Sequence, residues 1–179
     1  MTDQFDRDMQ SRNKVTAAHR AFTSALRDRC AELENFVAAA TAPGVSMADR
    51  LANGYTQVSA HTMKLELERV LDQFGLISQV PLNNFATFLY GKRKEMERER
   101  LAVFETMADV ATRMANAAAG NVAWTLAGEA MVRESGKVEA WRYAMQQFEV
   151  QFESVAAQLA NDLVAQLSGS STVPGPDDK

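Results

Sequence analysis

The side chains that could carry catalysis or hold a metal ion are few in this chain. Histidine occurs only at His19 and His61, whereas a di-iron bundle needs two Glu-x-x-His pairs on facing helices. The residues three positions before these histidines are Thr16 and Val58, so the motif is absent. His61 is instead expected to be a partly buried, hydrogen-bonded residue of a packed helix. We therefore expect no metal site in this protein.

The single cysteine, Cys30, is the remaining candidate for covalent chemistry. A nucleophilic cysteine needs a base beside it. Cys30 instead lies at helical spacing from Phe22, Leu26 and Leu33, as a small buried hydrophobic residue would. The sequence also contains no glycine-rich phosphate loop and no Gly-x-Ser-x-Gly motif. It thus predicts a protein that is not an enzyme and that takes no cofactor and no small-molecule substrate.

The densest run of charge, KRKEMERER at residues 92–100, permits two interpretations. It holds five basic and three acidic residues, a net charge of +2. In the first interpretation it is a solvated helix face, with Arg93 paired to Glu97 and Glu95 to Arg98. In the second, its basic side chains contact the phosphate headgroups of an anionic membrane surface. The candidate lipid contacts are Lys92, Arg93, Lys94, Arg98 and Arg100.

The overall composition narrows the possible partners and location. The chain has 19 basic and 23 acidic residues, a net charge of −4, which argues against nucleic-acid binding because that function needs a basic surface. A membrane-spanning helix needs about 20 apolar residues, and the least charged run, residues 114–128, is shorter and contains two asparagines. The N-terminus is polar, and a lone cysteine cannot form an internal disulfide. We expect a cytoplasmic protein, with peripheral membrane association as the alternative.

Helices must position these side chains, and the strongest helical signal covers residues 137–167. Its apolar residues recur in steps of three or four, which is typical of one helix stripe at near-heptad spacing. Such a stripe must be buried against another helix. The predicted packing or interface residues are Trp141, Met145, Phe148, Phe152, Val155 and Leu159. Several stripes of this kind exceed what one thin hairpin can cover, so we expect self-association as a homo- or heterodimer.

Breaks in the helical pattern suggest where the elements begin and end. A first helix is predicted over residues 3–42, stopped by Pro43-Gly44, with Ser46 as the N-cap of the next helix. The pattern is next interrupted at Gly75 and Pro81, which either end the second helix or kink it. It then continues past Gly120 without losing register. The following break is expected at Ser135-Gly136.

The predicted fold class is all-α. Residues 1–167 form one helical domain, and residues 168–179 have the composition of a disordered tail. The domain consists of long antiparallel helices of coiled-coil or BAR-like type if the helix continues past residues 75–81. It is a four-helix bundle if the chain folds back there.

The order of the pieces resembles a BAR domain of the sorting-nexin type. The resemblance covers about 130 residues and begins with the layout: a helix of about 40 residues, a Pro-Gly turn, a kinked segment at 46–133, a tip at 134–137 and a returning helix. The motif VPLNNF at 80–85, ahead of the charged run, is similar to the kink of the second BAR helix. KVEAW at 137–141, with Phe148-Glu149 and Phe152-Glu153, is similar to the opening of the third.

This resemblance implies a non-enzymatic dimer that binds or shapes curved membrane and supports vesicle or endosomal protein sorting. The five basic residues of the charged run would then be the lipid contacts. The alternative is a helical-bundle adaptor, chaperone or assembly subunit that acts through protein–protein contacts.

Overall fold

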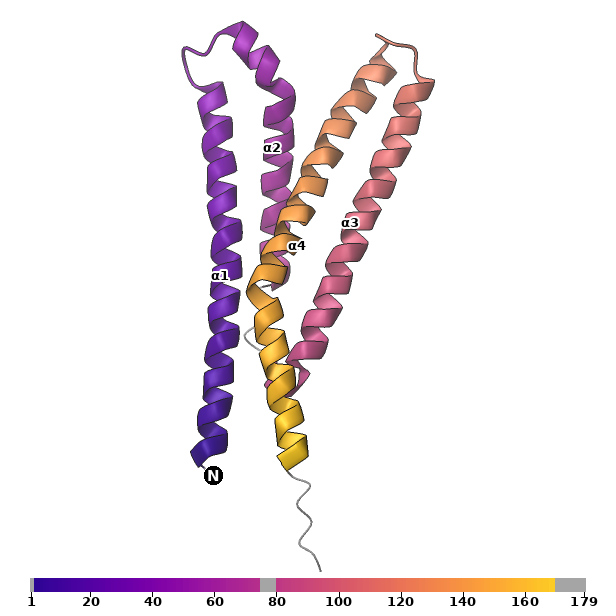
Figure 1. Ribbon diagram of the computed structural model, residues 1–179. Helices are drawn as coiled ribbons and strands as arrows, with labels where there is room; N and C mark the ends of the chain where they lie inside the picture. The colour runs from indigo at the N-terminus through magenta and orange to yellow at the C-terminus, as the bar shows by residue number, and fades with distance from the viewer. Residues whose placement is uncertain (1, 75–79, 170–179) are drawn as a thin grey trace, which may run out of the picture.

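The computed structural model describes residues 2–74 and 80–169, and within these ranges it contains helices and no strands (Figure 1). The predicted all-α class is therefore confirmed. In chain order, the elements are α1 (Thr2–Thr41), α2 (Met47–Phe74), the short 3-10 helix η2 (Leu82–Asn84), α3 (Phe85–Asn116) and α4 (Val122–Gly169).

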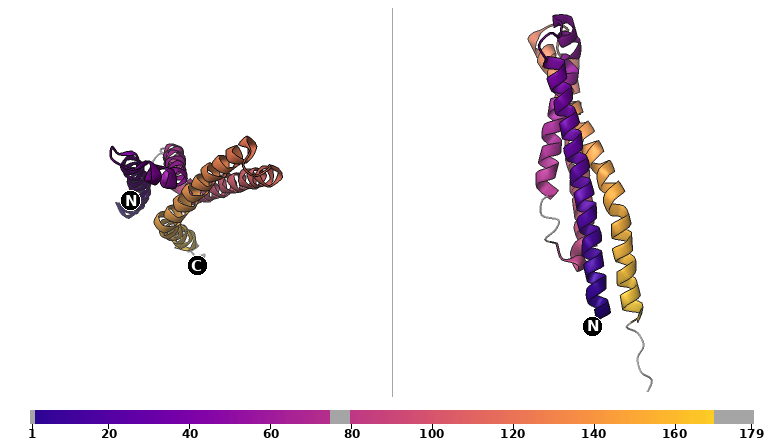
Figure 2. Two further views of the ribbon diagram at one scale, coloured as in Figure 1. Left: turned by 90° about the horizontal axis from the view of Figure 1, so that it is seen from above. Right: turned by 90° about the vertical axis from the view of Figure 1, so that its left-hand side faces the viewer.

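The four long helices form two antiparallel hairpins, α1–α2 and α3–α4 (Figure 1). The hairpins pack together over one half of the molecule and separate toward their turns, as both views in Figure 2 show. We call the separated end of the α1–α2 hairpin the first arm (residues 36–58) and that of the α3–α4 hairpin the second arm (residues 109–133). The start of α1 and the end of α4 both lie away from the arm tips.

The first turn forms as the sequence predicts. Gly44 adopts a φ of 99°, a left-handed conformation that glycine tolerates best. The Ser46 hydroxyl oxygen accepts a hydrogen bond from the backbone N–H of Asp49 at 3.1 Å. The same hydroxyl donates to the Asp49 carboxylate at 2.6 Å. Ser46 is thus the predicted cap of α2.

An uninterrupted helix through the Pro81 region is the first expectation that the structure corrects. Helix α2 ends at Phe74, and α3 begins at Phe85 after η2 and runs in the opposite direction. The chain therefore folds back, and the four-helix alternative is the correct one. Gly75 itself lies outside the described residues.

The second turn also differs from the prediction. It lies at residues 117–121, where Gly120 has a φ of 82° and the Asn121 side-chain oxygen accepts the Trp124 N–H at 2.8 Å. Ser135 and Gly136, predicted as a break, lie inside α4. The predicted tip at 134–137 is therefore wrong. Helix α4 reaches Gly169, two residues beyond the predicted boundary, and residues 170–179 of the predicted tail lie outside the described part of the chain.

The core lies where all four helices meet. Phe22 of α1 packs against Phe74 of α2 with ring centroids 4.9 Å apart, and against Phe152 of α4 at 5.7 Å. Phe148 and Phe152 lie 5.1 Å from each other. Among the described residues of the two arms, by contrast, only Val110 is buried. The arms are thus thin two-helix structures that extend from a well-packed base.

Candidate protein-binding cleft between the two arms

Cys30 is buried in the core as predicted, with its Sγ 3.9 Å from the carbonyl oxygen of Lys64. Burial, followed by the nearby Glu68 carboxylate, raises the pKa of this thiol. A thiol with a raised pKa carries little of the thiolate that acts as nucleophile. The surroundings of Cys30 therefore favour a packing role over covalent chemistry.

The two histidines do not form a site together. His19 Nε2 lies 3.0 Å from the carbonyl oxygen of Phe74 and so connects α1 to the last turn of α2. His61 is exposed, so the expectation that it is partly buried is wrong. Within residues 2–74 and 80–169, no cluster of three or more His, Cys, Asp or Glu side chains could hold a metal ion.

The five candidate lipid contacts do not share one face of α3. Lys92 pairs with Glu95 at 2.7 Å and lies 5.9 Å from the centroid of the Phe74 ring. Arg93 pairs with Glu97 and, across to α4, with Glu149, both at 3.3 Å. These two cations are therefore turned toward the neighbouring helices.

Lys94 and Arg98 are exposed on another side of α3. Lys94 Nζ lies 4.8 Å from the centre of the Tyr90 ring, and a hydrogen bond with Tyr90 raises the pKa of this lysine. Arg100 is half-buried. The structure thus brings together two of the five basic residues, next to the exposed Tyr90 and Leu101.

The predicted packing residues lie at the base of the molecule. Trp141, Phe148, Phe152 and Val155 are buried in the core. Met145 and Leu159 are partly buried against it. None of these six residues is placed in either arm, so the packing stripe positions the arms without lining the space between them.

A buried polar network, which the sequence analysis missed, joins the hairpins just below the arms. The indole Nε1 of Trp141 donates to the Glu66 carboxylate at 2.9 Å, and Arg69 pairs with the same carboxylate at 2.9 Å. Arg69 also stacks 5.7 Å from the Trp141 ring centre and pairs with Glu99 of α3. Because Glu66 is only 8% exposed, its charge depends on these partners. Its place on one helix face with Ser59 and Thr62 was the available signal.

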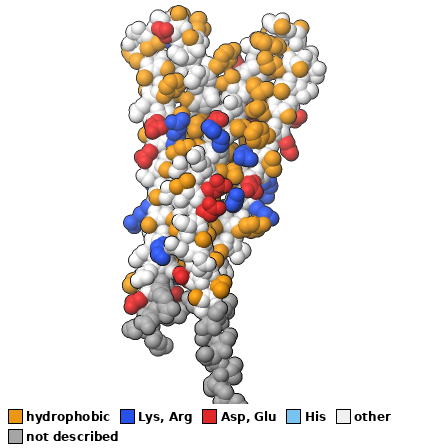
Figure 3. Space-filling model, in the orientation of Figure 1, with side chains coloured by type: hydrophobic (Ala, Val, Ile, Leu, Met, Phe, Trp, Pro, Cys, Tyr) orange, Lys and Arg blue, Asp and Glu red, His pale blue; other side chains and the backbone are white. Residues whose placement is uncertain are grey.

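Gly136 marks the closest approach of α2 and α4. A Cβ atom at this position would lie 2.5 Å from the backbone oxygen of Ser59 and 3.2 Å from Cβ of Thr62. Only a residue without a side chain allows two helix backbones to come this close. Beyond this point the two arms diverge, and Figure 3 shows the notch between them.

Apolar side chains line both walls of this notch, which we call the interarm cleft. Leu51 and Tyr55 of α2 are 74% and 60% exposed, and Val122 and Leu126 of α4 are 75% and 59% exposed. Tyr55 lies one turn before Ser59, which faces α4, and Val122 lies two heptads before Gly136, which faces α2. Both pairs therefore continue the faces that touch lower down. Figure 3 shows hydrophobic side chains on both arms beyond a belt of charge.

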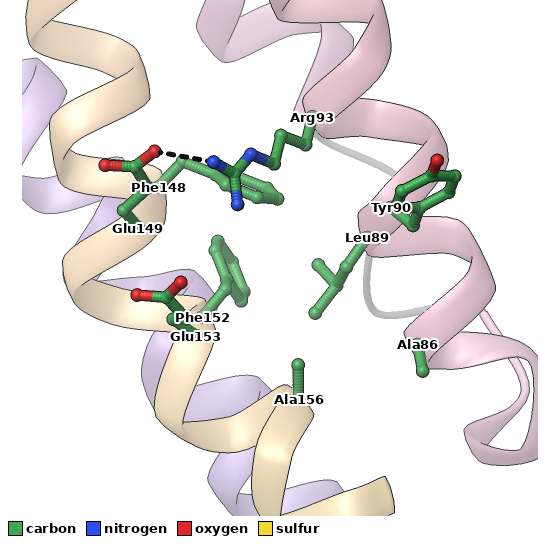
Figure 4. Close-up of a pocket in the computed structure, with 9 residues that line it drawn as sticks. All are labelled: Ala86, Leu89, Tyr90, Arg93, Phe148, Glu149, Phe152, Glu153 and Ala156. Atoms are coloured by element: carbon green, nitrogen blue, oxygen red, sulfur yellow. Dashed lines mark ion pairs between the residues drawn. The ribbon is translucent and has the colours of Figure 1, made fainter.

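A second groove lies between α3 and α4 near the base (Figure 4). Leu89, Phe148, Phe152 and Ala156 line it, and the Arg93–Glu149 ion pair lies at one side. Its volume of about 170 Å³ is below the roughly 300–1,000 Å³ that is usual for small-molecule sites. This groove therefore does not favour a small-molecule substrate.

Comparison with known proteins gives no relative: no protein-family model, no curated protein and no solved structure matches this chain. In the described part of the chain, no helix has the length and apolar character needed to cross a bilayer.

Proposed function

We propose that this protein is a non-enzymatic holding protein, of chaperone or assembly-subunit type, that binds an apolar helical segment of another protein in its interarm cleft. The observation that carries the proposal is the exposure of Leu51, Tyr55, Val122 and Leu126 on the two facing walls. Large apolar side chains gathered in this way are typical of interaction sites on soluble proteins.

The geometry of the walls indicates the kind of segment. Each wall presents two apolar residues four positions apart, Leu51 with Tyr55 and Val122 with Leu126. An amphipathic helix presents apolar residues with the same spacing and can therefore contact both walls. The nearby Glu129–Arg133 ion pair, at 3.7 Å, has no net charge and so selects neither acidic nor basic segments.

The magnitudes favour weak and reversible binding. Full burial of a large apolar side chain contributes about 1.5–3 kcal/mol, so four contribute roughly 6–12 kcal/mol before any costs. Association costs about 4–15 kcal/mol in lost freedom of motion. The small surplus fits a protein that holds and releases its clients better than one that forms a permanent complex.

We expect the double variant Leu51→Asp/Leu126→Asp to lose client holding. The measurement is light scattering from chemically denatured citrate synthase diluted into buffer with an excess of the protein. Two charged walls remove roughly 3–6 kcal/mol of apolar contact, so the concentration needed to suppress aggregation should rise at least about ten-fold.

Val150→Asp is the matched control, because Val150 is 63% exposed and lies on α4 outside both arms. This variant should suppress aggregation as well as the unchanged protein, and circular dichroism should show that all three proteins are equally helical. Absence of suppression by the unchanged protein, or full activity of the double variant, would rule out the proposed function.

The second candidate is the curved-membrane dimer that the BAR resemblance implies. It is favoured by one face of α3, on which Tyr90 and Leu101 are 61% and 58% exposed beside Lys94 and Arg98. Apolar anchors next to cations are suited to an anionic lipid surface.

This candidate predicts unequal effects of two neutralisations that change the net charge equally. Lys94→Gln/Arg98→Gln should weaken binding to phosphatidylserine vesicles by about 2 kcal/mol, or roughly 30-fold, because each basic residue near the surface contributes about 1 kcal/mol. Lys92→Gln/Arg93→Gln should change it little, since both cations face other helices. Co-sedimentation measures both, and no binding by the unchanged protein would eliminate the membrane candidate.

A further inference from the structure

The two walls of the interarm cleft belong to helices that run parallel and in a constant register. Trp141 of α4 contacts Glu66 of α2, a separation of 75 residues along the chain. Gly136 approaches both Ser59 and Thr62, with separations of 77 and 74 residues. A residue of α2 is therefore level with the residue about 75 positions later in α4.

This register places exposed apolar side chains at matching heights on the two arms. It sets Leu51 level with Leu126, and Met47 level with Val122. Met47 is 73% exposed, and the other three are exposed to a similar extent. The pairing is a property of the sequence extended along straight helices, because no contact between the arms is needed to derive it.

The faces agree as well as the heights. Leu126 lies two heptads before Ala140, which is fully buried. Leu51 lies 18 residues, or five turns, before Arg69, which reaches both Glu99 of α3 and Trp141 of α4. Both leucines therefore lie on the sides of their helices that are turned toward the opposite hairpin.

We propose that the arms of one molecule close on each other, with Leu51 beside Leu126 and Met47 beside Val122. The interaction surface is the wall of the cleft, and its partner is the opposite wall of the same chain. Closure extends the parallel α2–α4 contact beyond Gly136. Alanines at the intervening levels, Ala52 and Ala127, leave room for the two helices to approach.

The charges on the walls permit this contact. The Glu129–Arg133 ion pair of α4 is level with Gly54 and Val58 of α2, which carry no charge. The pair can therefore stay intact at the edge of the closed cleft. In its biological meaning this inference rests on the proposed function, because a closed cleft excludes a client and a client must displace one arm from the other.

Disulfide trapping tests the register directly. In a Cys30→Ala background of the full chain, Leu51→Cys/Leu126→Cys should form an intramolecular disulfide under mild copper–phenanthroline oxidation. The mismatched control is Val58→Cys/Leu126→Cys, whose positions differ by seven residues in level, or roughly 10 Å. A disulfide spans a Cα separation of about 4.4–6.8 Å, so the matched pair should react at least about ten-fold faster.

Equal rates for the two pairs, or disulfides found mainly between two molecules on a non-reducing gel, would overturn closure within one chain. The experiment contains no client, so its outcome is separate from that of the holding assay. Fast trapping with no client holding would keep closure and reject the proposed function. Client holding with slow trapping would do the reverse.

Discussion

Replacing Phe148 with alanine is expected to lower the free energy of unfolding by about 3–5 kcal/mol, the usual cost of a large buried aromatic residue. The Phe148 ring lies 6.2 Å from that of Phe22 on α1, 5.8 Å from Phe74 on α2 and 5.1 Å from Phe152. It therefore connects three helices, and no neighbour can move to fill the space without breaking another contact. Urea denaturation followed by circular dichroism measures the loss.

Phe36→Ala is the matched control for this substitution. Phe36 is 42% exposed on α1, where truncation removes little buried surface, so its effect should stay within about 0.5 kcal/mol of zero. A loss below about 1 kcal/mol for Phe148→Ala would mean that the aromatic cluster does not hold the hairpins together.

Alanine at Gly136 and alanine at Gly128 are expected to change stability in opposite directions. Both glycines lie inside α4, where alanine gains about 0.5–1 kcal/mol over glycine. At Gly128 a Cβ meets nothing within 4 Å, so the gain is realised. At Gly136 the same atom lies 2.5 Å from the Ser59 carbonyl oxygen, and overpacking of this kind costs about 1–3 kcal/mol.

Thermal or urea unfolding of the two variants beside the unchanged protein measures this difference. Because the substitution is the same and the helix is the same, propensity cancels between them and the packing cost of α2 against α4 remains. Equal stabilisation by both alanines would show that the helices do not approach closely at Gly136.

Local signals in the sequence were sufficient to predict much of the fold. Pro43-Gly44 and the Ser46 cap mark the first turn, and the structure places the turn and the cap there. The stripe that contains Phe148 and Phe152 lies in the core because its spacing is a property of one helix alone.

The errors arise where one residue type has two uses. Gly120 and Gly136 look alike in the sequence, but Gly120 is needed for its positive φ and Gly136 for its lack of a side chain. The first use is local, and Asn121 at the start of α4 was a usable signal for it. The second depends on which helix lies opposite, which spacing along one helix does not contain.

The interarm cleft could not be predicted for the same reason. Leu51 and Leu126 are ordinary apolar residues of amphipathic helices, and their exposure follows from the divergence of two hairpins beyond Gly136. The charged run at 92–100 was misleading in the opposite way. Neighbouring residues of a helix point in different directions, so a run that is dense in sequence is divided among several faces.

The two arms also act as levers about Gly136. Val122 is 14 residues from this glycine, or about 21 Å along the helix axis, so a rotation of only about 10° there displaces the tip by roughly 4 Å. Such a rotation requires no change in the aromatic core, because the core lies on the other side of the fulcrum. The spacing of the tips is therefore far more sensitive to small changes at the α2–α4 contact than the stability of the molecule is. A distance label placed at each tip would report on substitutions at Ser59 or Thr62 that a melting curve would barely register.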